Sequence, residues 1–208
     1  MQKIRFYLLD NSVIDGFVED TGIANLRLID LLNSHINKRK MGTSTFLSIR
    51  DGVQMIFTRR NVEEDENDSL VFAEEGEEKE VPMDFILNER LQLEKTLDLS
   101  DRVYSVNLSQ VLFGHSMSEF KGVKQERQRA LKNLIPKEVN VVTFNNYHLH
   151  GNIMIPAINK GQFPKDLNVG KNFIVLSNVK LKYLPSKKNY YRFHDHLIVN
   201  TQLIKAFY

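Results

Sequence analysis

The chain contains neither cysteine nor tryptophan among its 208 residues. Without thiols it forms no disulfide and no thiolate metal site, and cysteine cannot act as a catalytic nucleophile. A chain that does without disulfides suits a reducing compartment. We therefore expect a cytoplasmic location.

Long hydrophobic runs are also missing. No apolar stretch approaches the ~18 residues that a membrane-spanning helix requires. The start, "MQKIRFYLLDNSV", lacks a signal-peptide core, because only a short apolar run precedes the first acidic residue. We expect a soluble, intracellular protein without a membrane span.

Motifs that accompany catalysis are scarce. The sequence contains no Walker A stretch, no dinucleotide-binding glycine fingerprint and no Gly-x-Ser-x-Gly elbow. Acidic residues cluster only in residues 63–80, with ten acids and one base. Such a run repels itself and is typical of an exposed loop, not of a positioned acid/base pair. The sequence predicts a protein that is not an enzyme and uses no cofactor.

The net charge of +2 conceals a strong asymmetry between the two parts of the chain. Residues 1–98 carry 12 Lys/Arg and 20 Asp/Glu, a net charge of −8, whereas residues 99–208 carry 16 and 6, a net charge of +10. Opposed charges favour attraction between the halves, between copies of the chain, or toward an anionic partner. The alternative is that these charges only solvate two surfaces.

An internal duplication is the most informative feature of the sequence. "KIRFYLLDNSVIDGFV" (3–18) matches "EVNVVTFNNYHLHGNI" (138–153), with Asn11 on Asn146 and Gly16 on Gly151. "FLSIRDGVQMIF" (46–57) matches "FIVLSNVKLKYL" (173–184). "FILNERLQLEKT" (85–96) matches "LIVNTQLIKAFY" (197–208). Three blocks in the same order predict that one unit is present twice.

The matched blocks have the residue pattern of strands. They alternate apolar and polar residues and are rich in β-branched and aromatic side chains. Asn11 and Asn146 lie between apolar runs, where a tight hairpin turn requires a residue that tolerates left-handed backbone. Gly16 and Gly151, inside the second strand, predict a sharp bend or a close approach of two backbones.

We expect two domains. Residues 1–99 form the first, with an acidic insertion at about 61–83, and residues 100–208 form the second. A connecting helix is predicted at about 118–134, because Ser118 is a suitable N-cap, an apolar stripe follows, and Pro136 stops it.

The repeated pattern resembles the Sm-like (SH3-like) small β-barrels. The segments "GFVED…IDLLN" and "GNIMIP…KDLN" are similar to the first Sm signature, and "LIVNTQLI" is similar to the second, with Asn200 where glycine is expected. The resemblance implies a mainly β fold of two tandem Sm-like small barrels joined by one α-helix. More closely, the chain resembles an uncharacterised bacterial family of such barrels, which brings no activity with it.

The resemblance also suggests candidate loop residues. In Sm proteins an Asp/Asn loop touches RNA bases, which would place that role on four residues of this chain: Asp30, Asn33, Asp166 and Asn168. The alternative reading is that these side chains cap turns and strand ends.

The second part of the chain has a basic and aromatic segment, "KLKYLPSKKNYYRFHDHLIV" (180–199). Single-stranded nucleic acid requires positive charge for its phosphates and flat rings for base stacking. The candidate nucleic-acid-binding residues are Lys180, Lys182, Lys187, Lys188, Tyr190, Tyr191 and Arg192. The alternative is that the rings fill the core and the lysines keep the protein soluble.

Two His-x-His pairs, His148/His150 and His194/His196, each project to one face of a strand. Imidazoles so placed are able to share a metal ion. No carboxylate or recognised spacing supports such a site, so we expect surface histidines and no metal.

Two main hypotheses of function follow. The first is a non-enzymatic scaffold or adaptor that self-assembles, or docks protein partners, through strand edges and opposed charges. The second is RNA or single-stranded DNA binding by the basic part. Docking of the basic helix at an anionic membrane surface is a third hypothesis.

Overall fold

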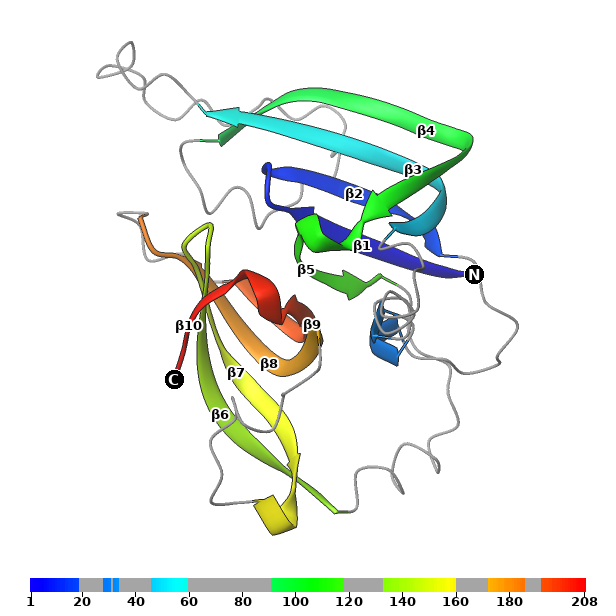
Figure 1. The fold of residues 1–208 in the computed structure, drawn as a ribbon. Helices are drawn as coiled ribbons and strands as arrows, with labels where there is room; N and C mark the ends of the chain where they lie inside the picture. The colour runs from blue at the N-terminus through cyan, green and yellow to red at the C-terminus, as the bar shows by residue number, and fades with distance from the viewer. Residues whose placement is uncertain are drawn as a thin grey trace.

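One antiparallel sheet of ten strands organises the protein (Figure 1). The computed structural model describes residues 1–18, 28–30, 32–33, 46–59, 91–117, 133–159, 172–185 and 192–208. The strand order is β10-β6-β7-β8-β9-β5-β1-β2-β3-β4. The predicted mainly β fold is confirmed.

The first half of the sheet consists of five strands: β1 (Gln2–Leu8), β2 (Ser12–Val18), β3 (Phe46–Arg59), β4 (Leu91–Asn107) and β5 (Val111–Ser116). The second half consists of β6 (Leu134–Thr143), β7 (Tyr147–Pro156), β8 (Phe173–Tyr183), β9 (Arg192–Asn200) and β10 (Ile204–Phe207). Short 3₁₀ turns occupy Leu108–Gln110, Ala157–Asn159 and Thr201–Leu203.

The two halves repeat the same series of elements. Each has four strands, a 3₁₀ turn and a fifth strand that pairs beside the first, in the orders β5-β1-β2-β3-β4 and β10-β6-β7-β8-β9. The halves join where β5 pairs with β9. Over the described residues the sheet is open, with β4 and β10 at its ends, and does not close into barrels.

The turns of the repeated hairpins lie where the sequence predicts them. Asn11 and Asn146 have φ values of 65° and 63°, and each lies in the turn of a two-strand hairpin. Asp51 and Asn178, aligned by the second block, also have positive φ, at 46° and 51°. Amide and carboxyl side chains tolerate this left-handed conformation better than other non-glycine residues.

The third match predicted from the sequence, residues 85–96 with residues 197–208, is wrong. The structural counterpart of Asn200 is Asn107, because each caps the 3₁₀ turn that follows the fourth strand. The side chain of Asn107 accepts from Ser109 N at 3.1 Å, and that of Asn200 accepts from Gln202 N at 3.0 Å. "VNLSQVLFG" (106–114) therefore matches "VNTQLIKAF" (199–207) without a gap.

Two hydrophobic clusters cover opposite faces of the central strands, and both combine residues of the two halves. Tyr7 and Phe113 of the first half pack in one cluster with Tyr147 and Leu149 of the second. In the other cluster, Ile4 and Phe6 are joined by Phe173 from β8. The predicted domain boundary near residue 100 lies within β4, and the division into two domains stays a prediction.

The joint between β2 and β3, expected as a loop, is helical at residues 28–30 and 32–33. Leu28 and Leu32, one turn apart, are both buried in the second cluster. The predicted helix at 118–134 extends too far, because Leu134 and Pro136 belong to β6 and pair with Pro156 and Met154. Its residues 118–132, and the acidic insertion at 61–83, lie outside the described residues.

A cross-strand pair has exchanged its large and small members between the halves. Phe6 faces Gly114, whereas the equivalent positions hold Val141 and Phe207. A Cβ added at Gly114 would collide with the ring of Phe6. The space between the first and fifth strands is therefore filled by Phe6 of the first strand in one half and by Phe207 of the fifth strand in the other.

We predict that Gly114→Ala destabilises the fold by about 1–3 kcal/mol because it overpacks this site. Phe6→Val should relieve the collision with the ring, although the added Cβ still lies 2.7 Å from the Arg5 carbonyl oxygen. The double variant should therefore be more stable than the sum of the single effects implies, by about 1 kcal/mol. Urea unfolding of the four proteins measures this coupling. Additive effects would contradict the packing of Phe6 against Gly114.

Candidate functional site

An ion pair between the first two strands is largely enclosed. Arg5 and Asp15 face each other across β1 and β2. The guanidinium donates two hydrogen bonds to the carboxylate, Nε to Oδ1 and Nη2 to Oδ2, both at 2.6 Å. The two side chains are only 11% and 15% exposed. A pair with this bidentate geometry fixes both side chains.

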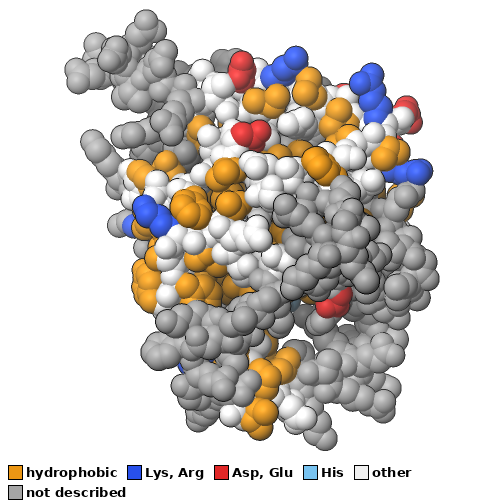
Figure 2. Space-filling model, in the orientation of Figure 1, with side chains coloured by type: hydrophobic (Ala, Val, Ile, Leu, Met, Phe, Trp, Pro, Cys, Tyr) orange, Lys and Arg blue, Asp and Glu red, His pale blue; other side chains and the backbone are white. Residues whose placement is uncertain are grey.

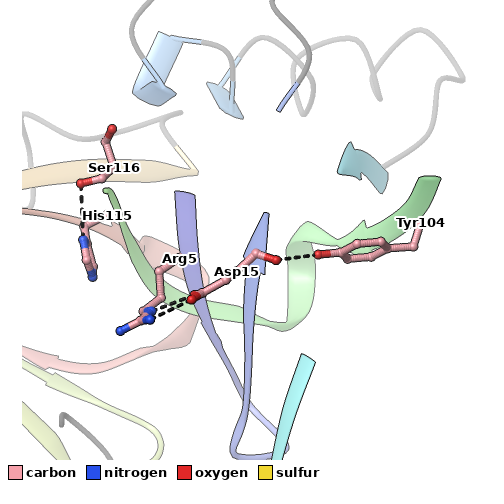
Figure 3. A network of polar contacts seen from close by, with 5 residues as sticks. All are labelled: Arg5, Asp15, Tyr104, His115 and Ser116. Atoms are coloured by element: carbon pink, nitrogen blue, oxygen red, sulfur yellow. Dashed lines mark hydrogen bonds and ion pairs between the residues drawn. The ribbon is translucent and has the colours of Figure 1, made fainter. Parts of the chain in front are cut away.

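Tyr104 of β4 approaches Asp15 from the side opposite Arg5 and donates its hydroxyl hydrogen to the Asp15 carbonyl at 2.8 Å (Figure 3). Burial raises the pKa of Tyr104, and the charge of Asp15 raises it further. Burial lowers the pKa of Arg5, but the hydrogen bond and charge of Asp15 outweigh this effect and leave that pKa raised. With their pKa values raised, Arg5 stays charged and Tyr104 stays protonated at neutral pH, so the arrangement supports the fold.

The equivalent place in the second half carries a different polar group. Asn140 and His150 face each other across β6 and β7, as Arg5 and Asp15 do across β1 and β2. Across β7 and β8, His148 faces Lys182 and His150 faces Lys180. Because directly opposed residues share a face of the sheet, these side chains form one surface, which we call the histidine face: Asn140, His148, His150, Lys180 and Lys182.

The two imidazoles of the histidine face meet at one atom. His148 Nε2 lies 3.0 Å and His150 Nδ1 lies 3.1 Å from Asn140 Oδ1. The other nitrogen of His150, Nε2, lies 3.1 Å from Glu138 Oε1. Burial lowers the pKa of His148, and the charges of His150 and Lys182 lower it further. His148 is therefore neutral at neutral pH.

Sequence reasoning missed Asn140 and Glu138, although the hairpin turn provides a signal for both. Once the turn is placed at residues 144–146, the register sets Asn140 opposite His150 and places Glu138 two residues further along the same strand. The same rule, applied to the turn at Asn11, finds the pairing of Arg5 with Asp15.

The structure divides the predicted nucleic-acid-binding residues. Lys180 and Lys182 share the histidine face, whereas Arg192 faces the buried Leu181 and so belongs to the opposite side of the sheet. The other candidates lie outside the described residues: Lys187, Lys188, Tyr190 and Tyr191. Phe193, which the prediction left out, faces Lys180 across the strands and is 73% exposed.

The second His-x-His pair lies apart from the first. His194 faces the buried Val179, on the opposite side of β8 from Lys180, and its ring lies 5.3 Å from that of His115. The four histidines of the two pairs therefore do not converge. Within the described part of the chain, no three His, Cys, Asp or Glu side chains group as direct metal ligands.

The loop candidates are only partly described. Asp30 and Asn33 lie in the helical joint, and Asp166 and Asn168 fall outside the described residues. The Asn33 side chain accepts from Phe173 N at 3.0 Å and donates to Phe173 O at 3.2 Å. It thus pairs with the start of β8 as a neighbouring strand would, which agrees with the capping interpretation of this residue.

The end strand β4 changes in charge along its length. Charged and hydrophobic side chains are mixed on the surface at the top of the view, where β3 and β4 lie (Figure 2). The charges of β4 stop at Arg102, and residues 103–107, "VYSVN", carry none. Val103 is 57% exposed and Ser105 is exposed as well.

Comparisons of the chain with models of protein families, with curated proteins and with solved structures found no match. Across the described segments, no helix has the length and apolar character needed to cross a membrane.

We predict that Asp15→Asn destabilises the protein by about 2–3 kcal/mol, because it leaves the enclosed Arg5 without a counter-charge. Asp195→Asn, a change at an exposed carboxylate of β9, is the matched control and should barely move the unfolding midpoint. Chemical unfolding at neutral pH compares the two variants. Equal effects of both substitutions would show that the ion pair contributes nothing to stability.

Proposed function

We propose that this protein is a non-enzymatic scaffold that self-assembles, with β10 of one copy pairing beside β4 of the next. The observation that carries the proposal is the junction inside the chain, where the fifth strand of one half pairs with the fourth strand of the other. The same kinds of strand are at the two free ends of the sheet. Repeating the internal junction between copies produces a head-to-tail contact, which forms rings or filaments.

The register of the internal junction defines the contact between copies. Phe113 faces Val199 and Gly114 faces Ile198 across β5 and β9. On the end strands, Phe207 is the counterpart of Gly114 and Ser105 is the counterpart of Ile198. Repeating the junction therefore places Phe207 of one copy opposite Ser105 of the next.

The backbone of both end strands is oriented for this pairing. Tyr208 exchanges two backbone hydrogen bonds with Asn140, at 2.7 and 3.0 Å. Because alternate residues of a strand point their N–H and C=O groups to opposite edges, those of Phe207 point away from β6. On β5, the Met117 N–H bonds to Lys3 O of β1. Gly114 lies three residues before Met117, so its backbone groups point to the other edge, toward Ile198 of β9. Ser105, the counterpart of Ile198, then directs its own to the free edge.

Charge also favours this contact. Exposed edge strands that avoid pairing usually carry charges, and the stretch of β4 required for the contact, residues 103–107, has none. The net charges of −8 and +10 on the two parts of the chain add attraction between the tail of one copy and the head of the next.

We further infer that the two halves are copies of one Sm-like small-barrel unit. The repeated element order, the paired positive-φ residues and the two Asn caps support a duplicated unit. The likeness to Sm-like proteins rests on the sequence segments alone.

We predict that Ser105→Pro weakens assembly, because it removes an outward N–H group and adds a ring at the contact. The dissociation constant should rise about tenfold or more, since one lost hydrogen bond and a steric clash together exceed ~1.4 kcal/mol. Light scattering over a concentration series measures the mass. The fold should persist, because this N–H does not face β3.

Ser105→Ala is the matched control and should assemble as the unchanged protein does. Raising the salt concentration should weaken both, since the opposed charges are screened. A chain that stays monomeric at all concentrations and ionic strengths would overturn the proposal.

A second candidate function, binding of single-stranded RNA or DNA, is favoured by one observation. Lys180 lies between His150 on one neighbouring strand and the exposed ring of Phe193 on the other. Positive charge beside an exposed ring is the combination on which a phosphate backbone and a stacked base bind together.

For this function we predict that replacing Lys180 and Lys182 together by Gln weakens binding of a fluorescent single-stranded oligonucleotide and lowers its salt dependence. The slope of log K against log salt should fall by about 0.7 for each phosphate that the variant no longer neutralises. Phe193→Ala should cost about 1 kcal/mol or more through lost stacking. Arg192→Gln, on the opposite side of the sheet, is the control, and an equal loss there, or no binding at low salt, would contradict the assignment.

A further inference from the structure

The histidine face contains two ring nitrogens directed at one point. His148 and His150 alternate with buried residues along β7, so both rings leave the same side of the strand. Their Nε2 and Nδ1 atoms lie 3.0 and 3.1 Å from the same amide oxygen, Asn140 Oδ1. Three potential donor atoms from two neighbouring strands are therefore gathered in one place.

Glu138 holds the Nε2 side of the His150 ring. Its carboxylate lies 3.1 Å from His150 Nε2, and a carboxylate accepts only from a protonated nitrogen. Nδ1 is the atom directed toward Asn140 Oδ1, and because an amide oxygen only accepts, a bound ion would replace the proton that Nδ1 donates there. Metal-binding histidines are held in this way, with the distal N–H donated to a carboxylate that orients the ring.

The spacing of these atoms suits coordination of an ion. A transition metal binds imidazole nitrogen at about 2.0–2.1 Å, so neighbouring ligands of one ion lie about 3 Å apart. The two nitrogens stand at that separation from the amide oxygen. The His150 side chain is 40% exposed, so an ion has access to the ring from solvent.

We propose that His148 Nε2, His150 Nδ1 and Asn140 Oδ1 form a surface site for a divalent transition-metal ion such as Zn²⁺, Ni²⁺ or Cu²⁺, with Glu138 orienting His150. Two histidines and an amide oxygen leave coordination positions open to water or to a group from another molecule. The sequence shows the His148/His150 pair, and the pairing of β6 with β7 adds Glu138 and Asn140 to it.

The lysines of the neighbouring strand, β8, limit the affinity of the site. Lys180 and Lys182 face the two histidines, and their positive charges oppose a cation. Glu138 offsets part of this repulsion. Ions that bind imidazole most strongly should therefore be preferred, with Cu²⁺ ahead of Ni²⁺ and Zn²⁺, whereas Mg²⁺ and Ca²⁺, which prefer oxygen ligands, should not bind.

Calorimetric titration of the tag-free full chain with each of these chloride salts tests the site. One Cu²⁺, Ni²⁺ or Zn²⁺ ion should bind per chain. His148→Ala and His150→Ala should each lower the affinity about tenfold or more, and Glu138→Gln should lower it about tenfold. Zinc titration followed by NMR should also shift the Asn140 side-chain amide and the imidazole signals of both histidines.

His194→Ala and His196→Ala are the matched controls, because the second pair has the same spacing on another strand. They should leave the titration unchanged. Asn140→Asp replaces the amide oxygen by a carboxylate and should raise the affinity, which keeps the test decisive if a histidine variant does not fold. The absence of binding by all three ions, or binding that depends on His194 or His196 instead, would overturn the site.

The outcome is separate from that of the proposed assembly. The site lies within β6 and β7 of one chain, so the Ser105→Pro variant, at a concentration where it is dissociated, should bind the ion as the unchanged chain does. Loss of binding in that variant would show that the site requires a second copy, contrary to a site formed by one chain alone.

Discussion

The pairing of β5 with β9 is the contact on which the rest of the structure depends. β5 also pairs with β1, so it is the strand through which two sets of five strands become one sheet. The buried side chain of Asn200 strengthens the junction, because its amide donates to Leu108 O at 3.2 Å and to Val111 O at 2.9 Å. Asn145 adds a contact between the two hairpin turns by donating to Leu9 O. Since both hydrophobic clusters include residues of each half, neither half retains its full core without the other.

Hairpin geometry was predictable from the sequence because its causes are local. Asn11 and Asn146 tolerate the left-handed turn, and the alternation of apolar residues sets which side of each strand is buried. The third matched block was misplaced because "ILN" at 86–88 resembles "IVN" at 198–200 as closely as "SVN" at 105–107 does. Only the capping contacts of Asn107 and Asn200 distinguish the two alignments. The order of the strands and the open sheet depend on long-range pairing, which no local pattern encodes.

The candidate sites, too, were predictable only where their geometry depends on local sequence. That the lysines and histidines alternate along their strands could be read from the sequence, and their sharing of a face follows from the register of β7 with β8. The separation of Arg192 from the lysines could not be read from the sequence, because it depends on the register between β8 and β9. For Asn33 the partner is Phe173, 140 residues away, so its structural role could be seen only in the folded chain.

The equivalent polar pairs of the two halves show how one position has acquired two roles. In the first half, the side of the sheet that carries Arg5 and Asp15 also carries Tyr7 and Val13, which pack against the second half. A polar pair there must satisfy itself, and the bidentate ion pair does so. In the second half, the equivalent side faces outward, and the ion pair is replaced by an amide and an imidazole. An exposed position does not require a self-sufficient pair, so its donor atoms are able to serve a ligand. The same fold position is thus structural where the halves meet and is open to binding where they do not.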